Sequence, residues 1–220
     1  MNPDWLIFDL DDTLYTPTTG VWDAIGDRIN LYIDQNLNLP KENISKLRDE
    51  LFLAHGTTLR GLQIEYGIDA LEYLAFVHDI PIEDYLTPDD SLRNSLNQIS
   101  IKKCIFTNAD RAHAQRVLNT LHLSGCFDLI VDIIDVAPFC KPYPQAFTTA
   151  LEILRVTDPA RCAIFEDSTR NILAARQLGL FTIQVGSNGH PPVGHIQIHS
   201  INEINRLFPN PTTLDTGDKP

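Results

Sequence analysis

The stretch WLIFDLDDT, residues 5–13, decides the fold class of this chain. It joins a four-residue apolar run, Trp5 to Phe8, directly to an acidic cluster that starts at Asp9. An apolar run this short suits a buried β-strand better than a helix, and the carboxylates mark the point where the strand leaves the core. The chain therefore opens with a strand that carries charged side chains at its carboxyl end.

Four later apolar runs repeat this form, and helical patterns separate them. The runs span 101–106, 129–134, 163–165 and 181–185, and helices are expected over 111–121, 144–154 and 168–178. In the first helix we expect Ala112, Val117 and Leu118 on the buried face, while Ser168 and Gly179 suit the two ends of the last helix. This alternation favours an α/β fold with a three-layer, Rossmann-like parallel sheet.

Polar residues follow several of the predicted strands at their carboxyl ends. In a parallel sheet these ends lie along one edge, which is where ligands bind in folds of this class. We therefore expect one site to gather Asp9, Asp11, Thr107, Glu166 and Asp167.

The segment 16–93 has a different pattern, because its apolar residues recur every three or four positions, as at Val21, Ile25 and Ile29 and later at Leu71 and Leu74. This period indicates helices throughout. We interpret 16–93 as a small helical cap, inserted after the first strand and covering the polar edge. The core would then comprise 1–15 and 94–207, and the composition of 208–220 predicts a disordered tail.

The composition is that of a globular enzyme, with 43% hydrophobic and 21% charged residues among 220. A net charge of −12 argues against nucleic-acid polymers and anionic membranes as partners, since both require a basic surface. The four cysteines lie far apart, and we expect free thiols. The first residues lack a basic region followed by a long apolar stretch, so we expect a cytoplasmic protein.

Four short motifs resemble those of the haloacid dehalogenase-like superfamily and occur in the same order. FDLDDTLY, residues 8–15, is similar to the first motif, D-x-D-x-[T/V]. Thr107 in CIFTNAD, Lys141 in FCKPYP and the pair Glu166–Asp167 in IFEDS match the second, third and fourth motifs. The resemblance covers the whole chain except the tail.

The resemblance implies a role for each motif residue in the hydrolysis of a phosphate ester. Asp9 would be the nucleophile that attacks phosphorus, and Asp11 would protonate the leaving alkoxide and later deprotonate water. Mg²⁺ would be held by Asp9, the Asp11 main-chain carbonyl and Asp167, with Glu166 binding directly or through water. Relatives that dehalogenate usually lack an aspartate at position 11, so Asp11 favours phosphate ester hydrolysis.

These residue types suit the chemistry. A carboxylate that approaches a phosphoryl group is repelled by about 4 kcal/mol at about 4 Å in a moderate dielectric. A divalent cation cancels this repulsion and orients the attack. Lys141 would add positive charge, and the Thr107 hydroxyl with the Asn108 N–H would donate to the phosphoryl group. A covalent intermediate also requires an acid that later acts as a base.

The most unusual part of the cap is HGTTLRGL, residues 55–62. Its glycines allow a close backbone approach, Thr57 and Thr58 supply hydroxyls, and Arg60 could contact an anion. A turn between two helices with a threonine cap is the structural alternative. The string resembles a segment, Y-G-T-T-x-x-G-L, of the pyrimidine 5′-nucleotidase-like branch, although His55 replaces the usual tyrosine. The branch implies UMP or CMP as substrate, with pyridoxal phosphate, lysophosphatidate and sugar phosphates as competitors.

Two other functions fit the same motifs, namely a sugar phosphomutase and a phosphate-ester binding protein without turnover. In each case the expected partner is a small phosphorylated metabolite, bound by a monomer or a homodimer. His190, His195 and His199 have no spacing typical of a zinc site, and we expect them in a surface loop.

Overall fold

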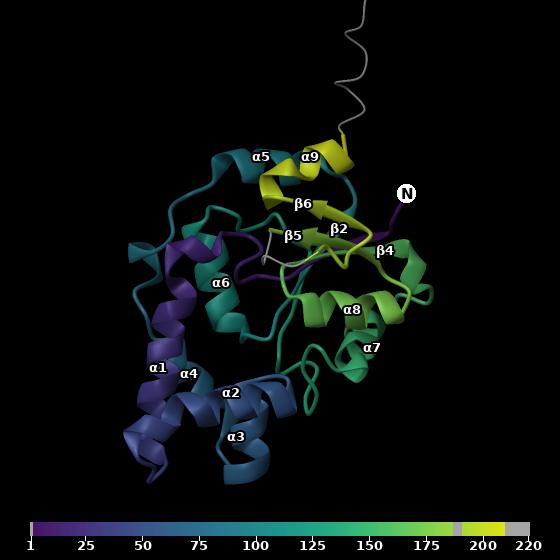
Figure 1. Ribbon diagram of the computed structural model, residues 1–220. Helices are drawn as coiled ribbons and strands as arrows, with labels where there is room; N and C mark the ends of the chain where they lie inside the picture. Colours follow the sequence, from purple (N-terminus) through teal and green to yellow (C-terminus); the bar gives the residue numbers. More distant parts are fainter. Residues whose placement is uncertain (1, 187–190, 210–220) are drawn as a thin grey trace, which may run out of the picture.

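The computed structural model describes residues 2–186 and 191–209, and the arrangement of its elements is shown in Figure 1. All six strands of the sheet pair in parallel, in the order β3-β2-β1-β4-β5-β6. The three-layer α/β fold expected from the sequence is therefore confirmed. The strands are β1 Trp5–Phe8, β2 Lys102–Phe106, β3 Leu129–Val131, β4 Cys162–Glu166, β5 Phe181–Val185 and β6 Ile196–Ile198.

The register of the central strands brings their polar ends to one level. Phe8, the last residue of β1, lies opposite Ile105 of β2 and Phe165 of β4. The next residue along each strand is therefore level with the others, which places Asp9 beside Glu166. The pairing of the strands therefore brings the predicted site residues together at one edge of the sheet.

Helices cover both faces of the sheet because successive strand residues point in opposite directions. Leu6 and Phe8 join one apolar cluster with residues of α5, α6 and α9, while Ile7 joins a second cluster with residues of α7 and α8. Figure 1 shows α5 and α9 on one side of the sheet and α7 and α8 on the other. These helices are α5 Asp90–Gln98, α6 Arg111–Thr120, α7 Pro144–Ile153, α8 Thr169–Gln177 and α9 Ile204–Leu207.

Most of the segment between β1 and β2 forms a group of helices beyond the edge of the sheet, as predicted for a cap, while its last helix, α5, lies against the sheet (Figure 1). Val21, Ile25, Ile29 and Leu74 are buried as expected, whereas Leu71 is exposed. The cap helices are α1 Val21–Asn36, α2 Ile44–His55, α3 Thr58–Tyr66 and α4 Ala70–Val77. Short 3₁₀ helices occupy Pro17–Thr19, Lys41–Asn43, Ile82–Asp84, Pro159–Arg161 and Ile201–Glu203.

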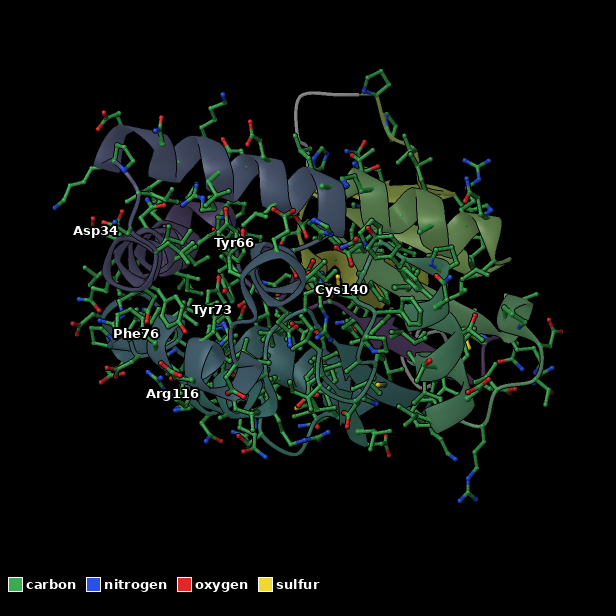
Figure 2. The ribbon with its side chains drawn as sticks, turned by 90° about the horizontal axis from the view of Figure 1, so that it is seen from below. Asp34, Tyr66, Tyr73, Phe76, Arg116 and Cys140 are labelled. Carbon is green, nitrogen blue, oxygen red and sulfur yellow. The ribbon has the colours of Figure 1, made fainter. Side chains whose placement is uncertain are left out.

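The cap returns to the core through residues 78–89, and this connection is bonded to α6. Arg116 donates to the carbonyls of His78, at 2.8 Å, and Ile80. Figure 2 shows Phe76 and Arg116 on the same side of the molecule and Cys140 where the cap meets the core. The predicted boundary at 93/94 falls inside α5, a helix that packs against α9.

Three expectations need correction. The loop expected around His195 and His199 contains β6, which pairs with β5, and His190 lies outside the described residues. On α6, Ala112 is exposed and His113 takes its expected place on the buried face. Phe208, expected to begin the tail, packs near Phe165 with ring centroids 6.3 Å apart. The rest of the predicted tail, 210–220, lies outside the described residues.

All four cysteines are buried and free, as expected. In residues 2–186 and 191–209, no helix is both long enough and apolar enough to span a lipid bilayer.

Candidate active site

A buried lysine connects the nucleophile candidate to the fourth motif. The Lys141 Nζ donates to Asp9 Oδ1 at 2.6 Å and to Glu166 Oε2 at 2.8 Å, and a third bond of 2.8 Å reaches the Phe106 carbonyl. Lys141 lies in the loop before α7, and only 1% of it is exposed. Four segments that are far apart in the sequence therefore meet at one ammonium group, as the motif order predicted.

Charge in this cluster is incompletely balanced. Burial and the neighbouring Glu166 raise the pKa of Asp9 to about 7, although Lys141 opposes this shift. Burial would lower the pKa of Lys141, but the two carboxylates outweigh it and raise the pKa above its ordinary value. The lysine is therefore protonated, but its charge does not cancel the burial and the carboxylate repulsion that raise the pKa of Asp9.

A third carboxylate completes a site that fits a hard divalent cation. One carboxylate oxygen from each of Asp9, Glu166 and Asp167 lies within 4.8 Å of the others. Burial and the charge of Asp9 raise the pKa of Asp167 to about 7. The Thr13 hydroxyl lies 3.3 Å from both Asp9 Oδ2 and Asp167 Oδ1. Oxygen ligands with excess negative charge are the donor set that Mg²⁺ prefers, so the residues present fit this ion.

Asp11 is held apart from that cluster by two donors. The Tyr15 hydroxyl donates to Asp11 Oδ1 at 2.5 Å, and the His113 Nε2 donates to the same oxygen at 2.9 Å. Burial alone would raise the pKa of Asp11, but the adjacent His113 and Tyr15 outweigh it and lower the pKa. The side chain thus occupies a separate position beside the nucleophile, and its role as an acid/base group stays a prediction.

Thr107 and Asn108 lie at the end of β2, where the second motif was predicted. Thr107 is buried, and its hydroxyl accepts a bond of 2.9 Å from the Ala109 N–H. The Asn108 side chain is bonded to the main chain of Lys141 at 2.9 Å in both directions. The side chain of Asn108 therefore shapes the lysine loop. Donation by the Asn108 main-chain N–H to a phosphoryl group stays a prediction.

A cavity of about 850 Å³ opens between this edge of the sheet and the cap. Asp9, Asp11 and Lys141 line its core side. Its cap side combines aliphatic side chains with polar and aromatic ones, the latter including Trp22, Asn30, Arg48, Phe52, Thr57 and Thr58. Such a volume accommodates a leaving group much larger than phosphate.

Of the three predicted cap contacts, Thr57 and Thr58 line the cavity and Arg60 does not. Thr57 accepts a bond of 3.1 Å from the Arg60 N–H and so caps α3, as the structural alternative proposed. The Arg60 guanidinium donates to the carbonyls of Ile133, at 2.7 Å, and Phe139, at 3.0 Å. These bonds engage Arg60 in joining the cap to the core, so the expected anion contact receives no support from its position.

Sequence reasoning missed Tyr15 and His113 as neighbours of Asp11. Tyr15 belongs to the quoted first motif, and its four-residue separation from Asp11 is the signal that could have identified it. His113 lies four residues before Val117, a spacing that places both on one helix face.

The haloacid dehalogenase-like hydrolase family model matches residues 3–179. The chain is also 27% identical to phosphate metabolism protein 8 of Saccharomyces cerevisiae, over 96% of this chain and 66% of the yeast protein. It therefore spans just under two thirds of that relative.

Two bacterial relatives have names that state an activity. Validoxylamine A 7′-phosphate phosphatase of Streptomyces hygroscopicus subsp. limoneus is 24% identical, over 80% of this chain and 83% of that protein. Beta-phosphoglucomutase of Bacillus subtilis is 29% identical, over 86% of this chain and 85% of that protein.

The fold is similar to that of the Bacillus subtilis protein YfnB, whose crystal structure contains magnesium. The TM-score is 0.62 at 21% identity, over 95% of this chain and 100% of that one.

Proposed function

This chain belongs to the haloacid dehalogenase-like hydrolases, and on that premise we propose that it is a magnesium-dependent phosphatase acting through an aspartyl-phosphate on Asp9. The observation that carries the proposal is the contact of Lys141 Nζ with both Asp9 and Glu166, beside Asp167. An isolated structural ion pair would not require two carboxylates on one buried lysine with a third carboxylate, Asp167, beside them.

In the first step Asp9 attacks phosphorus and the ester P–O bond breaks. The bond to Lys141 fixes one oxygen of Asp9 and the contact with Thr13 orients the other, so the nucleophile is held before the substrate arrives. The ammonium charge also opposes the repulsion between the carboxylate and the phosphoryl oxygens.

Asp11 then exchanges protons on the leaving-group side. It gives a proton to the departing alkoxide and takes one from the water that attacks the aspartyl-phosphate. Its position in the cavity wall, on the same loop as Asp9 but bonded to different partners, supports this division of roles.

Mg²⁺, held by Asp9, Asp167 and the Asp11 carbonyl, with Glu166 binding directly or through water, would supply charge that offsets the approach of two anions. The family and the acidic cluster support this assignment.

For the substrate we propose a pyrimidine nucleoside 5′-monophosphate. The cavity volume suits a nucleoside, and Thr57 and Thr58 of the HGTTLRGL segment line it. Trp22 is 50% exposed and Phe52 41% exposed, and both are among the lining residues. Aromatic surface of this kind suits the face of a base.

A sugar phosphomutase is the second candidate, and the similarity to beta-phosphoglucomutase of Bacillus subtilis favours it. The two functions differ in the acceptor of the phosphoryl group, which is water in one and a second sugar hydroxyl in the other. A mutase would transfer phosphate between sugar positions faster than it releases phosphate.

We further propose that the chain acts in the cytoplasm, as a monomer or homodimer, on a small phosphorylated metabolite. The free cysteines agree with a reducing compartment.

The test is phosphate release from p-nitrophenyl phosphate and from a panel of UMP, CMP, purine nucleotides, pyridoxal phosphate, lysophosphatidate and sugar phosphates, with and without Mg²⁺. We expect magnesium-dependent release, with kcat/KM highest for UMP or CMP. Asp9→Asn should abolish it, whereas Asp158→Asn, which alters the cap of a distant 3₁₀ helix, should not. Activity that survives Asp9→Asn would reject the mechanism.

A further inference from the structure

The carboxyl group of Asp11 is held more closely by its neighbours than a proton transfer alone would require. Both described hydrogen bonds to its carboxylate, from Tyr15 and from His113, end on Oδ1. Two donors that converge on one oxygen from different elements fix the rotation of the carboxyl group as well as its place. The other oxygen, Oδ2, therefore points in one fixed direction.

His113 is itself held from the cap side. Only 1% of it is exposed, and its ring stacks on that of His78 with centroids 4.3 Å apart and an angle of 23°. His78 directly follows α4 as its C-cap, and its Nδ1 lies 2.8 Å from Asp110 Oδ2. The other oxygen of Asp110 accepts from the His113 N–H at 2.7 Å. The ring of His113 is thus held by stacking on His78, and its main chain is held by the Asp110 cap.

We propose that Tyr15 and His113 are positioning residues for the acid/base step: they bind Asp11 Oδ1 and leave Oδ2 to exchange the proton with the leaving group. This inference rests on the proposed phosphatase activity. In the first step a bond forms from Asp9 to phosphorus, the ester bond breaks, and the proton on Oδ2 passes to the alkoxide. In the second, water attacks phosphorus, its proton returns to Oδ2 and the bond to Asp9 breaks.

The need for a proton depends on the ester, which provides a specific readout. An alkoxide must be protonated as it leaves, whereas p-nitrophenolate leaves without a proton. The value of kcat/KM covers the reaction only as far as departure of the leaving group, so it excludes the later attack by water. A misplaced Asp11 should therefore lower kcat/KM for alkyl esters and largely spare the aryl ester.

The experiment measures kcat/KM for glycerol 2-phosphate and p-nitrophenyl phosphate with saturating Mg²⁺ in wild type, His113→Ala, Tyr15→Phe and Gln115→Ala. We expect kcat/KM of His113→Ala and of Tyr15→Phe to fall about tenfold or more further for glycerol 2-phosphate than for p-nitrophenyl phosphate. Gln115 is an exposed residue of the same helix as His113, and its variant should match wild type. Should His113→Ala fail to fold, Tyr15→Phe, which removes a single hydroxyl, carries the test.

Equal losses on the two esters, or no loss on either, would overturn the inference. A crystal structure of His113→Ala gives a readout that does not need turnover. We expect Asp11 to leave its position beside the Tyr15 hydroxyl, and an unmoved carboxylate would also overturn the inference. Failure of the proposed phosphatase activity would look different, because wild type would then release no phosphate from either ester. The position of Asp11 in the His113→Ala crystal structure would still test whether His113 positions it.

Discussion

Asn108 holds both main-chain polar groups of Lys141. Its Nδ2 donates to the Lys141 carbonyl and its Oδ1 accepts from the Lys141 N–H, each at 2.9 Å. The side chain of the second motif thus fixes the backbone of the third, and the ammonium group reaches Asp9 from a braced loop. Groups that are oriented before the substrate binds cost no reorganisation during the reaction.

We predict that Asn108→Ala lowers kcat/KM for p-nitrophenyl phosphate by about a hundredfold, because a displacement of roughly 1 Å costs this much in an aligned site. Asn108→Asp keeps one bond and sets an oxygen against the Lys141 carbonyl, so it should not restore activity. The control is Asn94→Ala, on the exposed side of α5. Wild-type kinetics in Asn108→Ala would show that the loop is held by other contacts.

The acidic cluster leads to a prediction about binding that is independent of turnover. A cation that binds only the folded state raises the free energy of unfolding by about 2.7 kcal/mol at a concentration of about 100 Kd. We expect Mg²⁺ to raise the Tm of wild type and to leave Asp167→Asn unchanged, because Asp167 supplies one of the three convergent carboxylates. Thermal unfolding with and without Mg²⁺ checks this, with Asp158→Asn as the control that keeps the shift. An equal shift in Asp167→Asn would place the ion elsewhere.

Gly56 lies against the lysine loop, and this close approach predicts a large effect of a single methyl group. At Gly56, φ is +83°, and an added Cβ would lie 2.9 Å from Cys140 Sγ and 3.2 Å from the Lys141 carbonyl. Gly67 has a similar φ of +68° but no atom within 4 Å of an added Cβ. We expect Gly67→Ala to cost about 1 kcal/mol of backbone strain and Gly56→Ala about 1–3 kcal/mol more from overpacking. Urea unfolding measures both, and equal costs would contradict the steric argument.

The stability of the protein should depend on Asp110 in acid. Burial alone would raise the pKa of Asp110, but bonds from His78 and from the His113 N–H lower it from 3.8 to about 2. Because the folded state has the lower pKa, the stabilisation is complete above about pH 4 and is lost as the pH falls toward 2. We expect Asp110→Asn, which can still cap α6, to lower the free energy of unfolding by about 2 kcal/mol at pH 7.

Urea unfolding at several pH values tests this dependence, and the difference from wild type should shrink as the pH falls and vanish below about pH 2. Asp69→Asn is the matched control, because Asp69 caps α4 through the Glu72 N–H in the same way. A difference that stays constant from pH 7 to pH 2 would exclude the charge of Asp110 as its cause.

The fold could be predicted because the strands of a parallel sheet are buried on both faces and so appear as short apolar runs. β6 lacked this signal, since only three residues form it and Gln197 lies in the middle. Its place is set by pairing with β5, a contact that local pattern does not encode.

In the site, the motif residues could be predicted because four short motifs resemble those of a known superfamily in the same order, and the acidic ones follow predicted strands. Tyr15 and His113 could not, because their role arises from hydrogen bonds to Asp11, and the one from His113 spans 102 positions. The sequence pattern predicts Ala112 on the buried face because an apolar residue is the usual choice there. A buried histidine with a carboxylate partner reverses that choice.

The bonds of Arg60 to the loop before α7 bear on how such enzymes can be recombined. Arg60 contacts Ile133 and Phe139, and the Tyr143 hydroxyl donates to the Ala54 carbonyl. The segment that faces the leaving group and the loop that carries the lysine therefore fit each other. A helical insert transplanted from a relative would arrive without this counterpart, so the portable unit comprises the insert together with residues 133–143.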